Sequence, residues 1–421
     1  MICFAASGDL RNLIRTVNCL PAVYNGCCDI LFNDLNPLVV GRNIVVLWAL
    51  LNPDLTVDEA TEFALHLMYS SMLTPAMSNF LSRSLVMLNN LADSNDYSIN
   101  FNGKGTVKVI ADDDLNVTIE MLRSKYDQRT AVHAYTNIMC SPKRQDYTDR
   151  YLNSLEPAHR LSFTHYRTFG ILAPFSLDIS HFVEPNRLLY SSRGDWLLRD
   201  SDNPLHGWDV SLVLEHGEKC GLNRADSYGC LFFYLKNELS NFAKRLRDCQ
   251  INITITMLDA AVLPNFISSS SLKPFSPGCF DRIDTSNLAD YMSAPRILRD
   301  WAPFLNRRNK FAAILMNFMN WQKHYPVIPD VRAVGKQAIE KYASIMGIDV
   351  PDIPGSRNWS NSVSPAFVRF FAGMMTFTDD HKQFQSFLRD QAIEKVATIC
   401  GVKLRKINQV HPKVSICGSS L

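Results

Sequence analysis

Apolar runs and helically spaced apolar residues alternate at the front of the chain. Residues 2–6 form a short apolar run that predicts a strand, and apolar residues from Leu10 to Val17 recur at helical spacing. A second run over 29–34 predicts another strand. The apolar segment 37–51 opens with a proline, which suits the first position of a helix, so it predicts a buried helix. This order favours a parallel sheet with helical crossovers.

The same alternation returns near residue 229. An apolar stripe over 229–247 predicts a helix, and 251–258 is the clearest strand pattern in the chain. A short strand that runs into a polar loop is expected over 280–287, a helix over 295–306 and a further strand over 311–318. The strand over 311–318 is nearly all apolar, so we expect it to be buried on both faces.

The two blocks enclose a long segment of different character. Residues 55–100 predict helices and 105–110 predict a strand, whereas 117–175 is mixed. Residues 176–228 are rich in Ser, Asp, Pro, Gly and His and predict extended loops. Near the C-terminus, helices are expected over 333–346, 365–375 and 382–400, with a frayed tail from 411.

These patterns define an expected α/β organisation. One discontinuous domain, formed by 1–54 and 229–321, holds a mostly parallel sheet. A long α+β insertion, residues 55–228, follows the second strand. Residues 322–421 form a helical C-terminal region.

Composition and charge exclude several classes of protein. The 421 residues are 47% hydrophobic and 20% charged, which is ordinary for a globular chain. The net charge of +2 gives no strong field for nucleic acid. The longest apolar run near the front, Ile44–Leu51, is far below the about 20 residues that a spanning helix needs. We therefore expect neither a nucleic acid nor a membrane as a partner.

Cysteine usage and metal-type motifs point to an intracellular protein without a metal. The 11 cysteines are odd in number and include no CxxC pair, which favours reduced thiols and a cytoplasmic location. Asp112, Asp114 and Asn116 begin like a calcium loop, but the sixth and twelfth positions are Val117 and Arg123, where Gly and Glu are needed. No metal site is expected.

Small or acidic residues follow four of the expected strands. Because the carboxyl ends of parallel strands meet at one edge, where ligands of open α/β sheets bind, we expect these residues to converge. Gly8 lets a backbone approach a ligand, and Asp34, 26 residues later, suits a ribose-binding carboxylate, which is expected about 20 residues on. Asp259 suits an adenine amino group. The alternative that these residues are ordinary helix caps and loop acids stays open.

The order of these motifs carries a resemblance. Gly8-Asp9, then Asp34, then Asp259-Ala260 with Leu263-Pro264, then Phe280-Asp281-Arg282-Ile283 resembles the class I S-adenosylmethionine-dependent methyltransferases, over 2–50 and 229–320. The resemblance implies a Rossmann-like fold with S-adenosylmethionine as the cofactor. The cofactor-binding residues that it implies are Gly8, Asp9, Asp34, Asn36, Asp259 and Ala260.

The first loop departs from the methyltransferase pattern. In place of an acidic-x-Gly-x-Gly-x-Gly loop this chain has Phe4, Ala6, Gly8 and Leu10. Phe4 removes the acid that lies near the methionine amine, and Leu10 is expected to crowd the ligand. The chain also begins on the first strand, without the helix that covers the cofactor. Two explanations stay open: the fold begins directly with this strand, or the gene model lacks its first part.

The acceptor region follows the fourth strand. On the methyltransferase hypothesis the acceptor, an unknown small molecule or protein, lies near Asp284 and Asn287, and His206 and Asp209 are further candidates for acceptor binding or base chemistry. The structural alternative for residues 206–209 is that Trp208 anchors a long loop in the core.

A second resemblance spans most of 1–321. Its motifs are Ser7–Asn12, Asn33–Pro37 with Gly41-Arg42-Asn43, Gly207-Trp208-Asp209, Asp281–Asn287 and Met319-Asn320-Trp321. They resemble an uncharacterised fungal family whose longer members often carry a MYND-type zinc finger. That family is similar to the amino-terminal domain of the third dynein axonemal assembly factor. Two functions therefore stay open: methyl transfer to an unknown acceptor, or a non-catalytic interaction or assembly role, with a protein partner, on a degenerate methyltransferase fold.

Overall fold

A computed structural model describes most of the chain up to residue 321 and one C-terminal segment. The described residues are 1–93, 98–100, 104–110, 113–139, 148, 151–152, 155–193, 195–197, 203–321, 341, 344 and 380–405. The helices expected over 333–346 and 365–375 lie outside these residues, apart from Lys341 and Ser344 of the first, and so does the tail from 411.

The centre of the fold is a seven-stranded, mostly parallel sheet. From one edge to the other its strands are β4 (Ser98–Asn100), β5 (Thr106–Ile110), β7 (Ile251–Thr256), β2 (Cys28–Asn33), β1 (Ile2–Phe4), β8 (Arg282–Asp284) and β9 (Ala313–Leu315). Among the described strands of this sheet, β4 alone runs antiparallel to its neighbour. The expected α/β class and the mostly parallel sheet are thus confirmed.

Two strands of this sheet come from within the segment 55–228. The strand expected over 105–110 is present as β5, and it pairs in parallel with β7, with Val107 opposite Ile253. β4 extends the sheet by one further strand. A second, two-stranded sheet is formed by β3 (Met72–Leu73) and β6 (Glu184–Pro185).

Helices connect the strands along the whole described chain. Up to β7 they are α1 (Arg11–Asn18), α2 (Pro37–Leu51), α3 (Val57–Tyr69), α4 (Pro75–Asp93), α5 (Asp113–Arg123), α6 (Gln128–Met139), α8 (Pro157–Phe169), α9 (Val210–Lys219) and α10 (Ser227–Asp248). After β7 they are α11 (Leu263–Ser268), α12 (Ala289–Met292), α13 (Ala294–Trp301), the 3₁₀ helix η1 (Ala302–Phe304), α17 (Asp380–Asp390) and α18 (Ile393–Ile399).

Local sequence explains why several helices begin where they do. The side chain of Asn36 accepts a hydrogen bond from the amide of Leu38 and Pro37 occupies the first turn of α2. At α3, Thr56 and Glu59 form a reciprocal capping box. These contacts satisfy amide groups that a helix start otherwise leaves unbonded.

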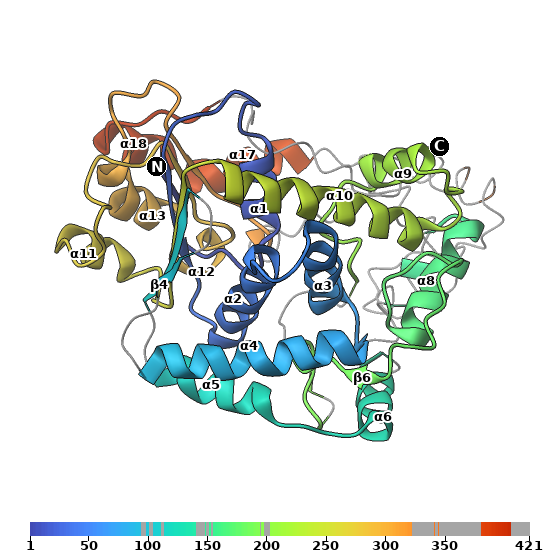
Figure 1. Cartoon of the computed structure of the whole chain (residues 1–421). Coiled ribbons are helices and arrows are strands. Elements are labelled where there is room, and N and C mark those ends of the chain that lie inside the picture. Colours follow the sequence, from blue (N-terminus) through green and yellow to red (C-terminus); the bar gives the residue numbers. More distant parts are fainter. Residues whose placement is uncertain are drawn as a thin grey trace.

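The sheet separates two hydrophobic cores. Successive side chains of a strand point to opposite faces, so Phe4 and Phe32 pack in one core, while Cys3 and Leu31 pack in the other. Figure 1 shows α1, α2, α3 and α10 on one side of the sheet, and α11, α13 and α18 on the other. The molecule is therefore a three-layer α/β/α arrangement around the sheet.

Two expectations about individual elements are wrong. The strand over 311–318 is only Ala313–Leu315 long, and its residues are half-buried rather than buried on both faces, because β9 is the last strand at its edge of the described sheet. The expected short strand within 280–287 is present as Arg282–Asp284 and, as expected, runs into a turn. The segment 176–228, expected to form extended loops, contains the helix α9. Its capping residue and short apolar stripe were not recognised because the segment as a whole is rich in polar residues.

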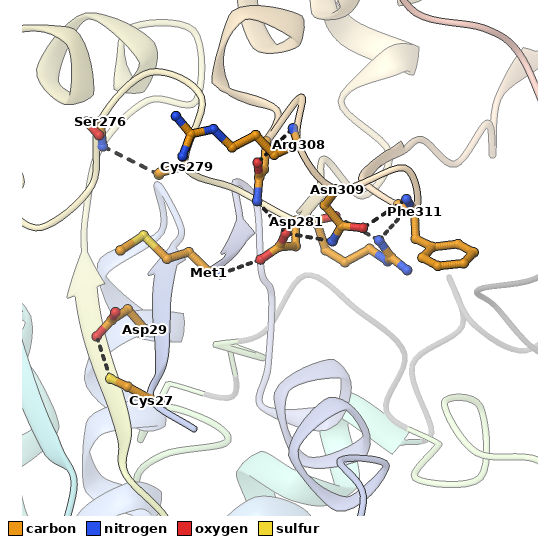
Figure 2. A network of polar contacts seen from close by, with 11 residues as sticks. Met1, Cys27, Asp29, Ser276, Cys279, Asp281, Arg308, Asn309 and Phe311 are labelled. Atoms are coloured by element: carbon orange, nitrogen blue, oxygen red, sulfur yellow. Dashed lines mark hydrogen bonds and ion pairs between the residues drawn. The ribbon is translucent and has the colours of Figure 1, made fainter. Parts of the chain in front are cut away.

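A polar network joins the amino ends of β1 and β8. The terminal ammonium of Met1 forms an ion pair with Oδ2 of Asp281 at 2.8 Å. Oδ1 of Asp281 accepts hydrogen bonds from Nδ2 of Asn306 at 2.9 Å and from Nδ2 of Asn309 at 2.7 Å. Figure 2 shows Asp281 between Met1 and Asn309. Partial burial acts to raise the pKa of Asp281, but the ammonium and the two amides outweigh it and lower that pKa below its ordinary value.

We expect Asp281→Asn to destabilise the fold by about 1 kcal/mol at pH 7, because the amide places a donor against the Met1 ammonium and the site is partly screened by solvent. A carboxylate with a lowered folded-state pKa stabilises the fold above its unfolded pKa of about 3.9 and loses that contribution as the pH falls further. Urea unfolding should therefore show the difference at pH 7 and a much smaller one near pH 3.

The control for this prediction is Asp300→Asn, which breaks a surface pair with Arg296 within α13 at 3.4 Å. That pair should contribute less than about 0.5 kcal/mol. Equal losses in the two variants at pH 7, or a loss for Asp281→Asn that stays the same at pH 3, would show that the network does not tie the strand ends.

Candidate functional site

The strand order reverses at the middle of the sheet. From β1, the chain adds β2 and later β7 on one side, and then β8 and β9 on the other. In open parallel sheets, such a reversal leaves a crevice outside the carboxyl ends of the two strands concerned, here β1 and β8. Phe4 lies opposite both Phe32 and Asp284, so the loops after β1, β2 and β8 leave the sheet at one level.

Gly8 and Asp34 contact each other across the first two of these loops. The amide of Gly8 donates to Oδ2 of Asp34 at 2.8 Å, and the amide of Asn36 donates to Oδ1 at 2.9 Å. Buried Asn43, on α2, donates through Nδ2 to the carbonyl of Gly8 at 2.8 Å. The loop after β1 is thus fixed from two sides.

The space beside Gly8 is open. Its φ of +59° lies in the left-handed region that favours glycine, and a Cβ atom added there would meet no atom within 4 Å. The glycine is therefore required by the backbone conformation and leaves room for a ligand to approach the backbone closely. Leu10, expected to crowd the ligand, is instead fully buried in the core with Leu13 and Ile14, so that expectation is wrong.

Asn33 is a positioning residue that the sequence analysis missed. Its fully buried side chain donates to the carbonyls of Ala5 and Leu258, both at 2.8 Å. Its Oδ1 accepts from the hydroxyl of Thr256 at 2.8 Å and from the amide of Leu258 at 2.9 Å. One amide group thereby joins the carboxyl ends of β1, β2 and β7. An asparagine ending an otherwise apolar strand was the available signal.

Asp9 is held by Arg11. Nε of Arg11 lies 2.7 Å from Oδ2 of Asp9, and its amide donates to Oδ1 at 3.0 Å. Burial acts to raise the pKa of Asp9, but the charge and hydrogen bonds of Arg11, with the charge of Arg42, lower it below its ordinary value. Asp9 therefore stays ionised and pairs with Arg11 at the start of α1.

Arg11, also missed from the sequence, brings the segment 206–209 to this loop. Its Nη1 donates to the carbonyl of His206 at 3.4 Å, and a Cβ on Gly207 would overlap its guanidinium. The His206 side chain is exposed and its ring lies edge-on to Tyr151, with centroids 5.1 Å apart. The His206 backbone, rather than its imidazole, makes the described contact with the β1 loop.

Asp209 and Trp208 stabilise the same segment. The carboxylate of Asp209 accepts from the amides of Ser211 and Leu212 and caps α9. Trp208 is buried, and its Nε1 donates to the hydroxyl of Tyr69 at 3.2 Å. Both side chains make the contacts that the structural alternative for this segment requires.

The remaining candidate residues also shape the loops. Oδ1 of exposed Asp259 accepts from the amide of Ala261 at 2.8 Å, while Ala260 is buried. Oδ1 of buried Asp284 accepts from the amide of Ser286 at 2.8 Å. Half-buried Asn287 follows this turn. Because β7 and β8 run parallel to β2 and β1, the segments after them lie at the same sheet edge as Gly8 and Asp34.

Within the described residues, two further features bear on function. No three His, Cys, Asp or Glu side chains are grouped so that they could hold a metal ion. No described helix combines the length and the apolar character that crossing a membrane requires.

Comparison with known proteins gives one match. Residues 1–73, which include β1, Gly8, Asp34 and α2, match the family model of a domain of unknown function (DUF4470). Searches of the curated proteins and of the solved structures found no match. Fold and site thus define an α/β protein with a mostly parallel sheet that is similar to this domain over its first 73 residues. The resemblances to methyltransferases and to the dynein assembly factor stay predictions.

We expect Asn33→Ala to lower the free energy of unfolding by about 3 kcal/mol, because it leaves several buried backbone groups without their hydrogen-bond partner. Urea unfolding measures this loss. Asn36→Ala is the matched control, since it removes one helix cap and should cost only about 1 kcal/mol. If the two variants unfolded at the same urea concentration, the Asn33 side chain would not hold the three strand ends together.

Proposed function

We propose that this protein binds S-adenosylmethionine at the carboxyl edge of a Rossmann-like sheet and is methyltransferase-like, transferring a methyl group to an unknown acceptor. The observation that carries the proposal is the contact of Gly8 with Asp34 beside the point where the strand order reverses. With β4 and β5 set aside, the order β7-β2-β1-β8-β9 has two strands on each side of the first one. This is the central strand order of Rossmann-like folds, the fold that the methyltransferase resemblance implies.

The residues present fit the cofactor in three respects. The open space beside Gly8 suits close approach of a ligand to the backbone. The carboxylate of Asp34 lies beside this space, held by the amides of Gly8 and Asn36, and it is the kind of group that accepts from ribose hydroxyls in Rossmann-like folds. Exposed Asp259, beside buried Ala260, suits the adenine amino group.

In this proposal the protein acts mainly by alignment. The cofactor, when bound, supplies an electrophilic methyl group on a sulfonium. The chain's own residues orient the two reactants: Asn33 fixes the loops that carry Gly8 and Asp34, and Asp284 fixes the turn that carries Asn287. The segment 206–209, tied to the β1 loop by Arg11, bounds the acceptor side.

A second candidate function is a non-catalytic interaction or assembly role. Two observations favour it. The candidate acids Asp34, Asp259 and Asp284 each already accept a backbone amide, as ordinary loop acids do. In addition, Leu35, in the loop after β2, and Tyr291, in the short helix α12 after β8, are 63% and 75% exposed and would suit contact with a protein partner.

Calorimetric titration with S-adenosylmethionine and S-adenosylhomocysteine tests the first proposal. We expect a dissociation constant of about 10 µM. Asp34→Ala should lower the affinity about 100-fold, since two hydrogen bonds from ribose hydroxyls to a carboxylate contribute about 3 kcal/mol. Asp29→Ala is the matched control: Asp29 lies on the same strand near its amino end, where it accepts from Asn252. No heat at about 1 mM ligand would overturn the cofactor proposal and leave the interaction role.

A second pair of variants separates ligand space from backbone strain. Gly8→Ala and Gly278→Ala both place a side chain at a positive φ, +59° and +76°, with no atom within 4 Å of the new Cβ. Both should lose about 1 kcal/mol of stability. We expect only Gly8→Ala to weaken cofactor binding, because only its methyl group enters the ligand space. Equal affinities of the two variants would place the ligand elsewhere.

A further inference from the structure

A cavity of about 230 Å³ lies away from the sheet edge described above. One wall is the first two turns of α4, where Pro75, Ser78, Asn79 and Ser82 recur at the spacing of a single helix face. The other walls are the segment after α5 and the β6 region, which lie at the bottom of Figure 1. The volume is below the about 300 Å³ at which pockets for drug-sized ligands begin, so a small molecule is the fitting occupant.

Arg187 gives this cavity its chemistry. The residue is 5% exposed, yet its hydrogen bonds go to neutral oxygens: Nη1 donates to the carbonyl of Arg123 and Nη2 donates to the hydroxyl of Ser82, both at 2.9 Å. No carboxylate among the described residues lies within ion-pair distance of it. A guanidinium has five N–H donors, and these two bonds leave the other three without a described acceptor.

A buried guanidinium without an anionic partner is costly, because its charge is removed from water. The burial of Arg187 lowers its pKa, against the opposing effects of Tyr126 and Glu184. An anion in the cavity would supply the missing counter-charge and accept the remaining donors. The alternative is that Arg187 serves only to close the C-terminal end of α5 through the Arg123 carbonyl.

The other lining groups favour a phosphate. Lys125 is exposed and adds a second positive charge, while Glu184 is the one carboxylate among the described lining residues. Ser78, Ser82 and Asn79 offer side-chain donors, and they lie on the first turns of a 19-residue helix, the positive end of its dipole. Arginine with hydroxyl and amide donors is the set that recognises phosphoryl oxygens.

We propose that the cavity between α4, Lys125 and Arg187 binds the phosphate group of a small phosphate monoester, with Arg187 as its main anchor. The site is independent of the cofactor proposal, since none of its described lining residues lies at the carboxyl edge of the sheet. Glu184 would limit the charge that the site accepts and would accept from a hydroxyl or amine of the ligand.

Calorimetry of the full chain with inorganic phosphate and with glycerol 3-phosphate tests this site, with chloride at matched ionic strength as the blank. We expect dissociation constants of about 0.1–1 mM, tighter for the ester. Arg187→Gln should weaken binding by at least about tenfold. Because Arg187 is buried, Lys125→Gln, at an exposed position, keeps the test valid if that variant fails to fold.

Removing a positive and a negative charge at the cavity should change the affinity for phosphate in opposite directions, which makes the test specific. Lys125→Gln should weaken phosphate binding by about threefold or more, and Glu184→Gln should strengthen it by a similar factor. Lys219→Gln, an exposed lysine at the end of α9, should leave it unchanged. Asp34→Ala should also leave it unchanged, which separates this site from the proposed cofactor site.

Two results would overturn the proposal. The first is the absence of binding by the unmodified chain at about 10 mM phosphate. The second is binding that Lys125→Gln and Glu184→Gln change no more than Lys219→Gln does. Either result would leave Arg187 as a structural clamp between α4 and α5.

Discussion

The carboxyl edge of the sheet depends on the side chain of Asn33. It bonds backbone groups of the segments after β1 and β7 while belonging to β2, so three chain segments distant in sequence meet at one amide. Its own carbonyl also accepts the amide of Ser7, which leads directly into Gly8. The geometry of the Gly8–Asp34 contact therefore depends on the hydrogen bonds that Asn33 makes. A candidate ligand site here rests on a buried polar network rather than on loop flexibility.

Much of the sheet and its helices could be predicted from local pattern. The expected helix 37–51 coincides with α2, because a cap and a proline mark its start and Asn52-Pro53 its end. The pairing of β5 with β7 could not be predicted, since hydrophobic periodicity identifies strands but carries no information on partners in distant segments. For the same reason the apolar run around β9 gave no indication that the strand would be half-exposed.

The candidate site was predictable in part. Strand ends and their residue types placed Gly8, Asp34 and Asp284 at one edge, because parallel strands share that edge. Sequence does not say which polar atoms are already satisfied by neighbouring amides, and it therefore could not distinguish loop-holding carboxylates from ligand-binding ones. Asn33 contacts Leu258 and Arg11 contacts His206 across 225 and 195 residues, and no local motif encodes such distant contacts.

The two cores are completed at different times in the life of the chain. The core that contains Phe4 and Phe32 is built from residues 4–257, whereas the core that contains Cys3 and Leu31 also needs Ile393 and Val396 of α18. A ribosome releases residues in order from the N-terminus. The second face of the sheet thus stays incompletely covered until α18 has been synthesised, and apolar side chains of this core remain exposed on the nascent chain during that interval.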